Sequence, residues 1–87
     1  MIYTIDNPKL VKDYYSFKGR ENFTGVVKDE GNHIAYYLNG KLHREDGPAM
    51  QLSNGMKEWW LNDKPYGWNN HFTNESWIRF VKLELLK

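Results

Sequence analysis

The sequence predicts a small α+β domain: an antiparallel β-meander of hairpin repeats, with about four to six strands, covered or capped by a C-terminal α-helix. Two observations carry this prediction. A pattern of strand and turn recurs at an offset of 23 residues, and the last fourteen residues place apolar side chains at helical spacing. We therefore expect one domain, divided into an N-terminal cap (residues 1–19), the meander (20–66), a loop (67–73) and the helix (74–86).

The composition limits the size of the core and the classes of partner. A chain of 87 residues buries about 60–65% of the surface that its unfolded form exposes, so we expect no large internal cavity. The aromatic residues, 16% of the chain, are expected to form the core. Lys and Arg total 12 against 11 Asp and Glu, and the two signs are mixed along the chain. This balance excludes an acidic DNA mimic and disfavours a strong phosphate-binding surface.

The chain has no cysteine, which excludes disulfides, thiolate metal sites and a Cys nucleophile. Its first ten residues, MIYTIDNPKL, show no basic leader followed by an apolar run. No segment approaches the roughly 18 apolar residues that a membrane span requires. We therefore expect a soluble, unprocessed, cytoplasmic protein without a membrane span.

The N-terminal segment is predicted to contain a short helix. Asn7 suits the N-cap, Pro8 suits the first helical position, and Gly19 suits the far end. The side chains that would share one helical face are those of Leu10, Val11 and Tyr14. The alternative for residues 14–17 is a strand.

The recurring pattern relates residues 31–41 to residues 54–64, which lie 23 residues further along the chain. YLNGK (37–41) aligns with WLNDK (60–64), and each begins at the second of two adjacent aromatics that follow a Gly-led turn. YYSFKGRENFTGVV (14–27) is interpreted as a third, degraded copy. A period this short suits a unit of two strands and two turns.

Turn residues separate the predicted strands. Asn39-Gly40 and Ser53-Asn54-Gly55 predict hairpins, because Asn and Gly tolerate positive φ. Residues 45–48 (EDGP) predict the corner between these hairpins, where Pro48 would begin a strand or lie on an edge. Residues 62–74, with Pro65, one Gly and four Asn, are predicted as a loop.

Alternation within the strands places aromatic rings on both faces of the sheet. The side chains expected on one face are those of Tyr36, Leu38, Trp59 and Leu61, and those on the other are Tyr37 and Trp60. One interpretation is structural: a helix covers one face, and ring ladders with long polar stems such as that of Arg44 cover the other. The other interpretation is a binding surface.

The C-terminal segment NESWIRFVKLELLK predicts a helix that covers the sheet. Asn74 is the expected N-cap, and Glu75 lies in the first turn. The apolar stripe at helical spacing consists of Trp77, Ile78, Val81 and Leu85.

The stretch YYLNGKLHREDGPAMQLSNGMKEWWLND resembles a short repeat found in small proteins of tailed bacteriophages and some large DNA viruses. It is more distantly similar to membrane occupation and recognition nexus (MORN) repeats, which build antiparallel meanders from hairpins. The resemblance covers about residues 33–66. NDKPYGW (62–68) departs from the pattern, with Asp63 in place of Gly and Pro65-Tyr66 in place of Leu-His, so we expect the array to end there.

The resemblance implies a β-repeat scaffold and, in the eukaryotic relatives, contacts with proteins or lipid headgroups. It implies no catalytic activity and assigns no residue a chemical role. It suggests a small phage accessory protein that acts in the host cytoplasm on a host component.

The dense polar group at residues 43–46 allows two interpretations. His43, Glu45 and Asp46 are residue types that bind metals or act as acids and bases, but the three His of the chain lack the ligand spacing of a zinc site. The structural interpretation is that Arg44 and Asp46 bond to the turn while His43 ends a strand. The sequence holds no P-loop or Gly-x-Ser-x-Gly motif, so we expect no enzyme and no cofactor.

Two binding functions remain. Single-stranded nucleic acid or a nucleotide could stack on aromatic strands flanked by basic residues; the rings are Tyr36, Tyr37, Trp59 and Trp60, and the bases are Lys41, Arg44, Lys57 and Lys64. Acidic residues among these bases disfavour it. The leading prediction is a non-enzymatic module that binds and modulates or inhibits a host protein, a defence protein included. The predicted contacts are His43, Arg44, Trp60, Tyr66 and Trp68. A homodimer could form through an edge strand such as the one begun by Pro48.

Overall fold

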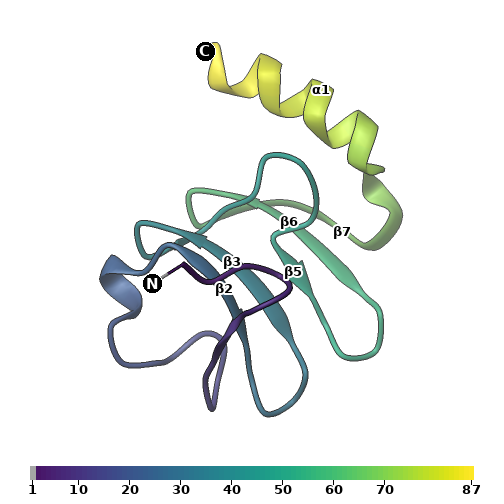
Figure 1. Ribbon diagram of the computed structural model, residues 1–87. Helices are drawn as coiled ribbons and strands as arrows, with labels where there is room; N and C mark the ends of the chain where they lie inside the picture. The colour runs from purple at the N-terminus through teal and green to yellow at the C-terminus, as the bar shows by residue number, and fades with distance from the viewer. Residues whose placement is uncertain (1) are drawn as a thin grey trace.

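Among residues 2–87, which the computed structural model describes, seven strands form one open sheet that is followed by a C-terminal helix (Figure 1). The sheet order is β1-β2-β3-β5-β6-β7, and β4 pairs with β3 beside β5. The elements are β1 (Lys9–Leu10), η1 (Arg20–Asn22), β2 (Gly25–Lys28), β3 (Ile34–Leu38), β4 (Lys41–Leu42), β5 (Met50–Gln51), β6 (Lys57–Leu61), β7 (Lys64–Trp68), η2 (Asn69–His71) and α1 (Asn74–Leu85). The predicted α+β class, with an antiparallel sheet and a C-terminal helix, is confirmed. The sheet has more strands than predicted, and β1 pairs with β2 in parallel.

The predicted hairpins are present, and the turn residues adopt the backbone conformations that their types favour. Asn39 (φ 51°) and Gly40 (φ 81°) both have the positive φ that a type I′ turn requires between β3 and β4. Gly55 (φ 89°) lies in the loop between β5 and β6. Asn62 (φ 51°) and Asp63 (φ 67°) form a further turn of the same kind between β6 and β7. The prediction of a loop from residue 62 was therefore wrong as far as Trp68.

The loop prediction was wrong because it took Pro65, which cannot donate a backbone hydrogen bond, as evidence against a strand. β7 lies at the edge of the sheet, where a residue without an N–H group leaves no ladder bond unmade. The loop over residues 67–73 accordingly begins only after Trp68. A strand follows Pro48 as predicted, but it is not the expected edge strand, because β5 lies between β3 and β6.

The predicted N-terminal helix is absent from the described residues. The segment instead contributes β1, and residues 11–22 then cross the sheet as an irregular strap that ends in η1. We call residues 11–22 the N-terminal strap. The backbone N–H of Tyr14 donates to Asp29 Oδ2 (3.1 Å), and its carbonyl accepts from the Tyr37 hydroxyl (2.7 Å). These bonds to the sheet replace the bonds within a helix that Asn7 and Pro8 had suggested. The alternative of a strand at residues 14–17 is not observed either.

The two faces of the sheet carry separate cores, and the predicted assignment of rings to faces agrees with the register. One core is covered by the N-terminal strap; its buried residues are Val27, Ala35, Tyr37, Leu42 and Met50. The other is covered by α1; its buried residues are Trp59, Leu61, Trp77 and Val81. In Figure 1, α1 accordingly lies at the β6–β7 end of the sheet, away from the N-terminal strap.

The helix α1 covers the sheet as predicted, but its cap differs. The N-cap is Thr73, whose Oγ1 accepts from the Ser76 N–H (3.1 Å), while Ser76 Oγ accepts from the Thr73 N–H (2.9 Å). This capping box begins the helix at Asn74, so Asn74 is not the cap. Within residues 2–87 no helix has the length and apolar composition needed to cross a membrane.

The turn at Gly40 gives a stability prediction with a matched control. A Cβ at Gly40 would lie 2.7 Å from the carbonyl carbon of Glu21 in η1, whereas a Cβ at Gly55 would have no neighbour within 4 Å. Both glycines have positive φ, which costs Ala about 1–2 kcal/mol. We expect Gly40→Ala to lower the free energy of unfolding by about 1–3 kcal/mol more than Gly55→Ala, because η1 must also move. Urea unfolding measures both; equal losses would contradict the close packing of η1 on the turn.

Two tyrosines, Tyr37, which is buried, and Tyr14, which is partly buried, predict a loss of stability in alkali. Burial raises the pKa of Tyr37 above its ordinary value of 10.0, although the Arg20 Nε–H bond to its hydroxyl opposes this. Burial also raises the pKa of Tyr14, and the charge of Glu58 adds to it. Above pH 10 the unfolded chain therefore binds fewer protons than the folded chain, and stability falls as pH rises through the folded pKa values.

Urea unfolding between pH 8 and about pH 11 tests this. We expect Tyr37→Phe to be less stable at pH 8, because two hydrogen bonds are lost. Its free energy of unfolding should then fall less steeply with pH than that of the wild type. An unchanged slope would show that Tyr37 does not stay protonated in the folded state.

Candidate functional site

The polar group at residues 43–46 lies in the loop between β4 and β5. Both of these strands pair with the same side of β3, one after the other, so the loop leaves the sheet and returns to it. The predicted corner is therefore an excursion from one strand position and not a reversal of the chain. The N–H of His43 donates to the Tyr36 carbonyl before the excursion, and the Tyr36 N–H donates to the Ala49 carbonyl after it.

The ring of His43 is buried and has structural partners on both nitrogens. Nδ1 accepts from the backbone N–H of Asn62 (3.1 Å), and Nε2 lies 2.8 Å from Glu45 Oε2. Because Nδ1 is an acceptor, Nε2 carries the proton and donates to Glu45. The ring thus holds the turn between β6 and β7 against the end of β4.

A second turn docks in the same way. The Asn39 N–H donates to Thr24 Oγ1 (2.9 Å), as the Asn62 N–H donates to His43. The second residue of each turn also bonds to the segment beside it. The Gly40 N–H donates to the Phe23 carbonyl, and the Asp63 N–H donates to the Leu42 carbonyl. At the Asn62-Asp63 turn, His43 therefore supplies the acceptor that the Thr24 hydroxyl supplies at the Asn39-Gly40 turn.

Arg44 is also used within the fold. Its Nε–H donates to Asp46 Oδ1 (2.8 Å), its Nη1 donates to the Pro48 carbonyl (3.2 Å), and its guanidinium lies over the Tyr36 ring (4.1 Å). A Cβ at Gly47 would lie 2.7 Å from Arg44 Cζ, so a larger residue there would displace the guanidinium from this position. The Arg44 carbonyl accepts from Trp77 Nε1–H (2.8 Å), which anchors α1 to the loop. No three His, Cys, Asp or Glu side chains in residues 2–87 are grouped so that they could hold a metal ion.

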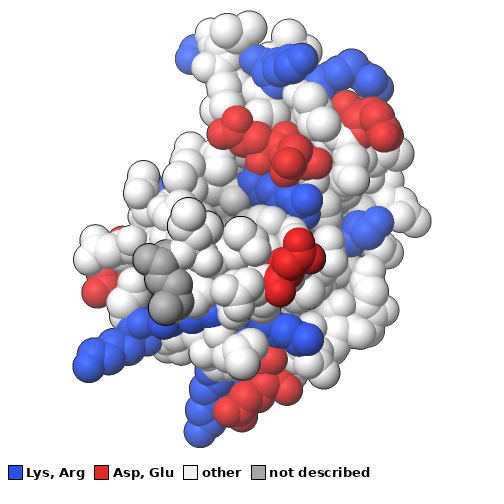
Figure 2. All heavy atoms as spheres, in the orientation of Figure 1, with Lys and Arg blue, Asp and Glu red and all other residues white. Residues whose placement is uncertain are grey.

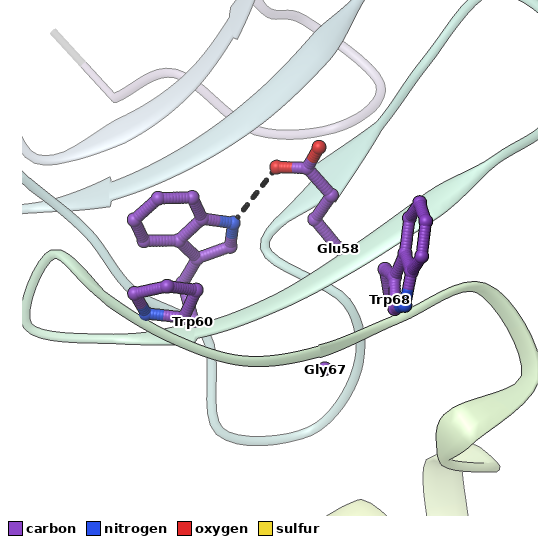
Figure 3. A pocket seen from close by; sticks show the side chains of 5 residues that line it. Glu58, Trp60, Gly67 and Trp68 are labelled. Carbon is purple, nitrogen blue, oxygen red and sulfur yellow. Dashed lines mark hydrogen bonds between the residues drawn. The ribbon is translucent and has the colours of Figure 1, made fainter.

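A hollow of about 290 Å³ lies at the β6–β7 end of the sheet, on the face opposite the one that α1 covers. It is lined by Glu58, Trp60, Pro65, Gly67 and Trp68. Figure 3 shows the Trp60 and Trp68 rings on either side of Gly67, with the Glu58 side chain between them. The Trp60 Nε1–H donates to Glu58 Oε1 (3.0 Å), which fixes the orientation of both side chains. We call this feature the Trp60–Trp68 hollow.

The register explains why these side chains meet. Glu58 pairs with Trp68, Trp59 pairs with Gly67, and Trp60 pairs with Pro65, so Tyr66 is an extra residue in a β-bulge. Trp68 follows Glu58 onto the face of the hollow and is 67% exposed. Its ring does not fold back onto the sheet.

The five predicted contact residues separate into three places. Trp60 and Trp68 line the hollow, and His43 and Arg44 lie in the loop between β4 and β5. Tyr66 lies under α1, with its ring centroid 5.3 Å from that of Phe80. Glu58 was not predicted, and the signal that could have found it was its position two residues before Trp60, which places both on one face.

The four rings proposed to stack nucleic-acid bases do not form one open surface. Tyr37 and Trp59 are buried, with 3% and 1% exposed, and they lie in different cores. On the face drawn in Figure 2, red Asp and Glu side chains lie among the blue Lys and Arg side chains. Neither feature suits a phosphate backbone.

Comparison with known proteins gives no identification. No protein-family model matches the chain, and no curated protein or solved structure matches it.

The role of His43 can be tested with a pair of substitutions. His43→Ala removes the acceptor for the Asn62 N–H and should lower the free energy of unfolding by about 1–3 kcal/mol. His43→Asn places an amide oxygen near the position of Nδ1 and should recover part of the loss. Thermal unfolding measures both. Equal losses would show that the ring acts through its volume and not through this hydrogen bond.

Proposed function

We propose that the chain is a non-enzymatic protein-interaction module whose contact surface is the Trp60–Trp68 hollow. The observation that carries this proposal is the 67% exposure of Trp68 at the rim of a concave surface. The apolar surface of an exposed Trp is removed from water only when a partner covers it, and this removal is favourable. Trp is also among the residues most enriched in binding hot spots.

The sheet supplies a rigid support for this surface. Trp60 lies on β6, which is paired on both sides, and its indole is held by Glu58. Little side-chain freedom is therefore lost when a partner binds Trp60, which favours affinity. The second ring, on the edge strand β7, is open to the partner.

The resemblance to phage-type and MORN repeats extends the proposal to the partner. Hairpin repeats would form the scaffold, and the partner would be a host protein, a defence protein included, in the cytoplasm of the infected cell. The mechanism would be steric: the module covers the partner's surface and so modulates or inhibits it. His43 and Arg44 would contribute through the shape of their loop, since their polar atoms already have partners within it.

The alternative of nucleic-acid binding has less support in this geometry. A base stacked on Trp60 or Trp68 would bring phosphate groups near the Glu58 carboxylate. Repulsion between these like charges would oppose the electrostatic term that provides most non-specific affinity.

Capture from a bacterial lysate tests the proposed surface. We expect the immobilised wild-type chain to retain a protein that Trp68→Ala loses, because the variant lacks the exposed ring. The free energy of unfolding of the variant should lie within about 0.5 kcal/mol of that of the wild type, so lost binding would not reflect unfolding. Leu83→Ala is the matched control: this side chain is 69% exposed but lies on α1. Retention of the same proteins by Trp68→Ala, or of none by the wild type, would contradict the proposal.

A further inference from the structure

The charge within the Trp60–Trp68 hollow points to the chemistry of its ligand. Glu58 Oε1 accepts one hydrogen bond from Trp60, whereas no hydrogen bond reaches Oε2 within the described residues. The four ion pairs of residues 2–87 do not include Glu58. Lys64, the basic residue of the neighbouring strand β7, places its ammonium group 5.4 Å from the centroid of the Tyr66 ring. A carboxylate without a cationic partner therefore lies between two indole rings.

This arrangement disfavours apolar and acidic ligands. An apolar group that filled the hollow would remove the Glu58 carboxylate from water without a compensating charge, which is unfavourable. An acidic group would be repelled. A cation is attracted by the carboxylate and by the faces of the indole rings, and Trp is the aromatic residue that binds cations best.

The shape of the hollow favours a guanidinium over an ammonium ion. The hollow is shallow and is bordered by the flat rings of Trp60 and Trp68, which stand apart on either side of it. A planar guanidinium stacks on aromatic faces, is weakly hydrated, and donates several N–H bonds in one plane. A compact ammonium would keep more of its water in such an open site.

We propose that the Trp60–Trp68 hollow binds an arginine side chain of the partner, with the guanidinium against the indole rings and an N–H donated to Glu58 Oε2. This inference rests on the proposed function, since it names the chemistry of the residue that the partner inserts. Trp60 and Trp68 supply the surface, and Glu58 selects the charge.

The test is a titration of the isotope-labelled chain at low ionic strength, followed by the NMR signals of the Trp60 and Trp68 indole N–H groups. The probe is a five-residue blocked peptide, Gly-Gly-Arg-Gly-Gly, and its control replaces the arginine by citrulline, which has nearly the same shape without the charge. We expect the arginine peptide to shift both signals and to bind about tenfold more tightly than the citrulline peptide, as loss of one charge-assisted contact predicts. A lysine peptide should bind with intermediate affinity.

Glu58→Gln provides the decisive variant, because its amide oxygen can still accept from the Trp60 indole while the charge is gone. It should lose about tenfold in affinity for the arginine peptide and bind the citrulline peptide equally well. Glu75→Gln, in the first turn of α1, is the control and should behave like the wild type. Unchanged indole signals of the buried Trp59 and Trp77 would show that each variant is folded.

Equal binding of the arginine and citrulline peptides, or unchanged affinity in Glu58→Gln, would overturn the inference. Its failure is distinguishable from that of the proposed function. If the chain captures a protein through Trp68 but binds the arginine and citrulline peptides equally well, the proposed function stands and the arginine inference is wrong. Selective binding of the arginine peptide by a chain that captures no protein would leave only the ligand chemistry.

Discussion

The register that joins β3, β5 and β6 decides how each aromatic ring of this sheet is covered. Ala35 lies opposite Met50, and Met50 lies opposite Glu58, so these three side chains share one face. By alternation Trp60 lies on that face and Trp59 on the other. A single sheet cannot bury two apolar faces by itself, and the N-terminal strap and α1 each cover one of them.

The loop between β4 and β5 connects the two covers. Its carbonyl at Arg44 holds Trp77 of α1, and its His43 ring holds the turn between β6 and β7. Leu42, just before the loop, belongs to the core under the N-terminal strap. Where two cores meet, backbone groups are removed from water and need partners. The density of polar residues here is thus explained by hydrogen bonding, and catalytic chemistry is not needed to account for it.

Local signals explain what could be predicted of the fold. The turn at Asn39-Gly40 and the helix α1 depend on residues adjacent in sequence, and both were predicted close to their positions. The N-terminal strap was not, because its shape depends on Asp29 and Tyr37, which are distant in sequence. β7 was missed since Pro65 breaks an internal strand but not an edge strand, and edge position is a property of the whole sheet.

The candidate site shows the same boundary between local and global information. Trp60 and Trp68 could be predicted as contact residues by type, but their meeting depends on the bulge in β7. Had the pairing of Trp60 with Pro65 continued without an extra residue, Trp68 would lie opposite Lys57, on the face that α1 covers. The bulge moves Trp68 to the side of Glu58 and leaves the extra residue, Tyr66, beneath α1. One inserted residue thus both completes the core under the helix and creates the hollow on the opposite face.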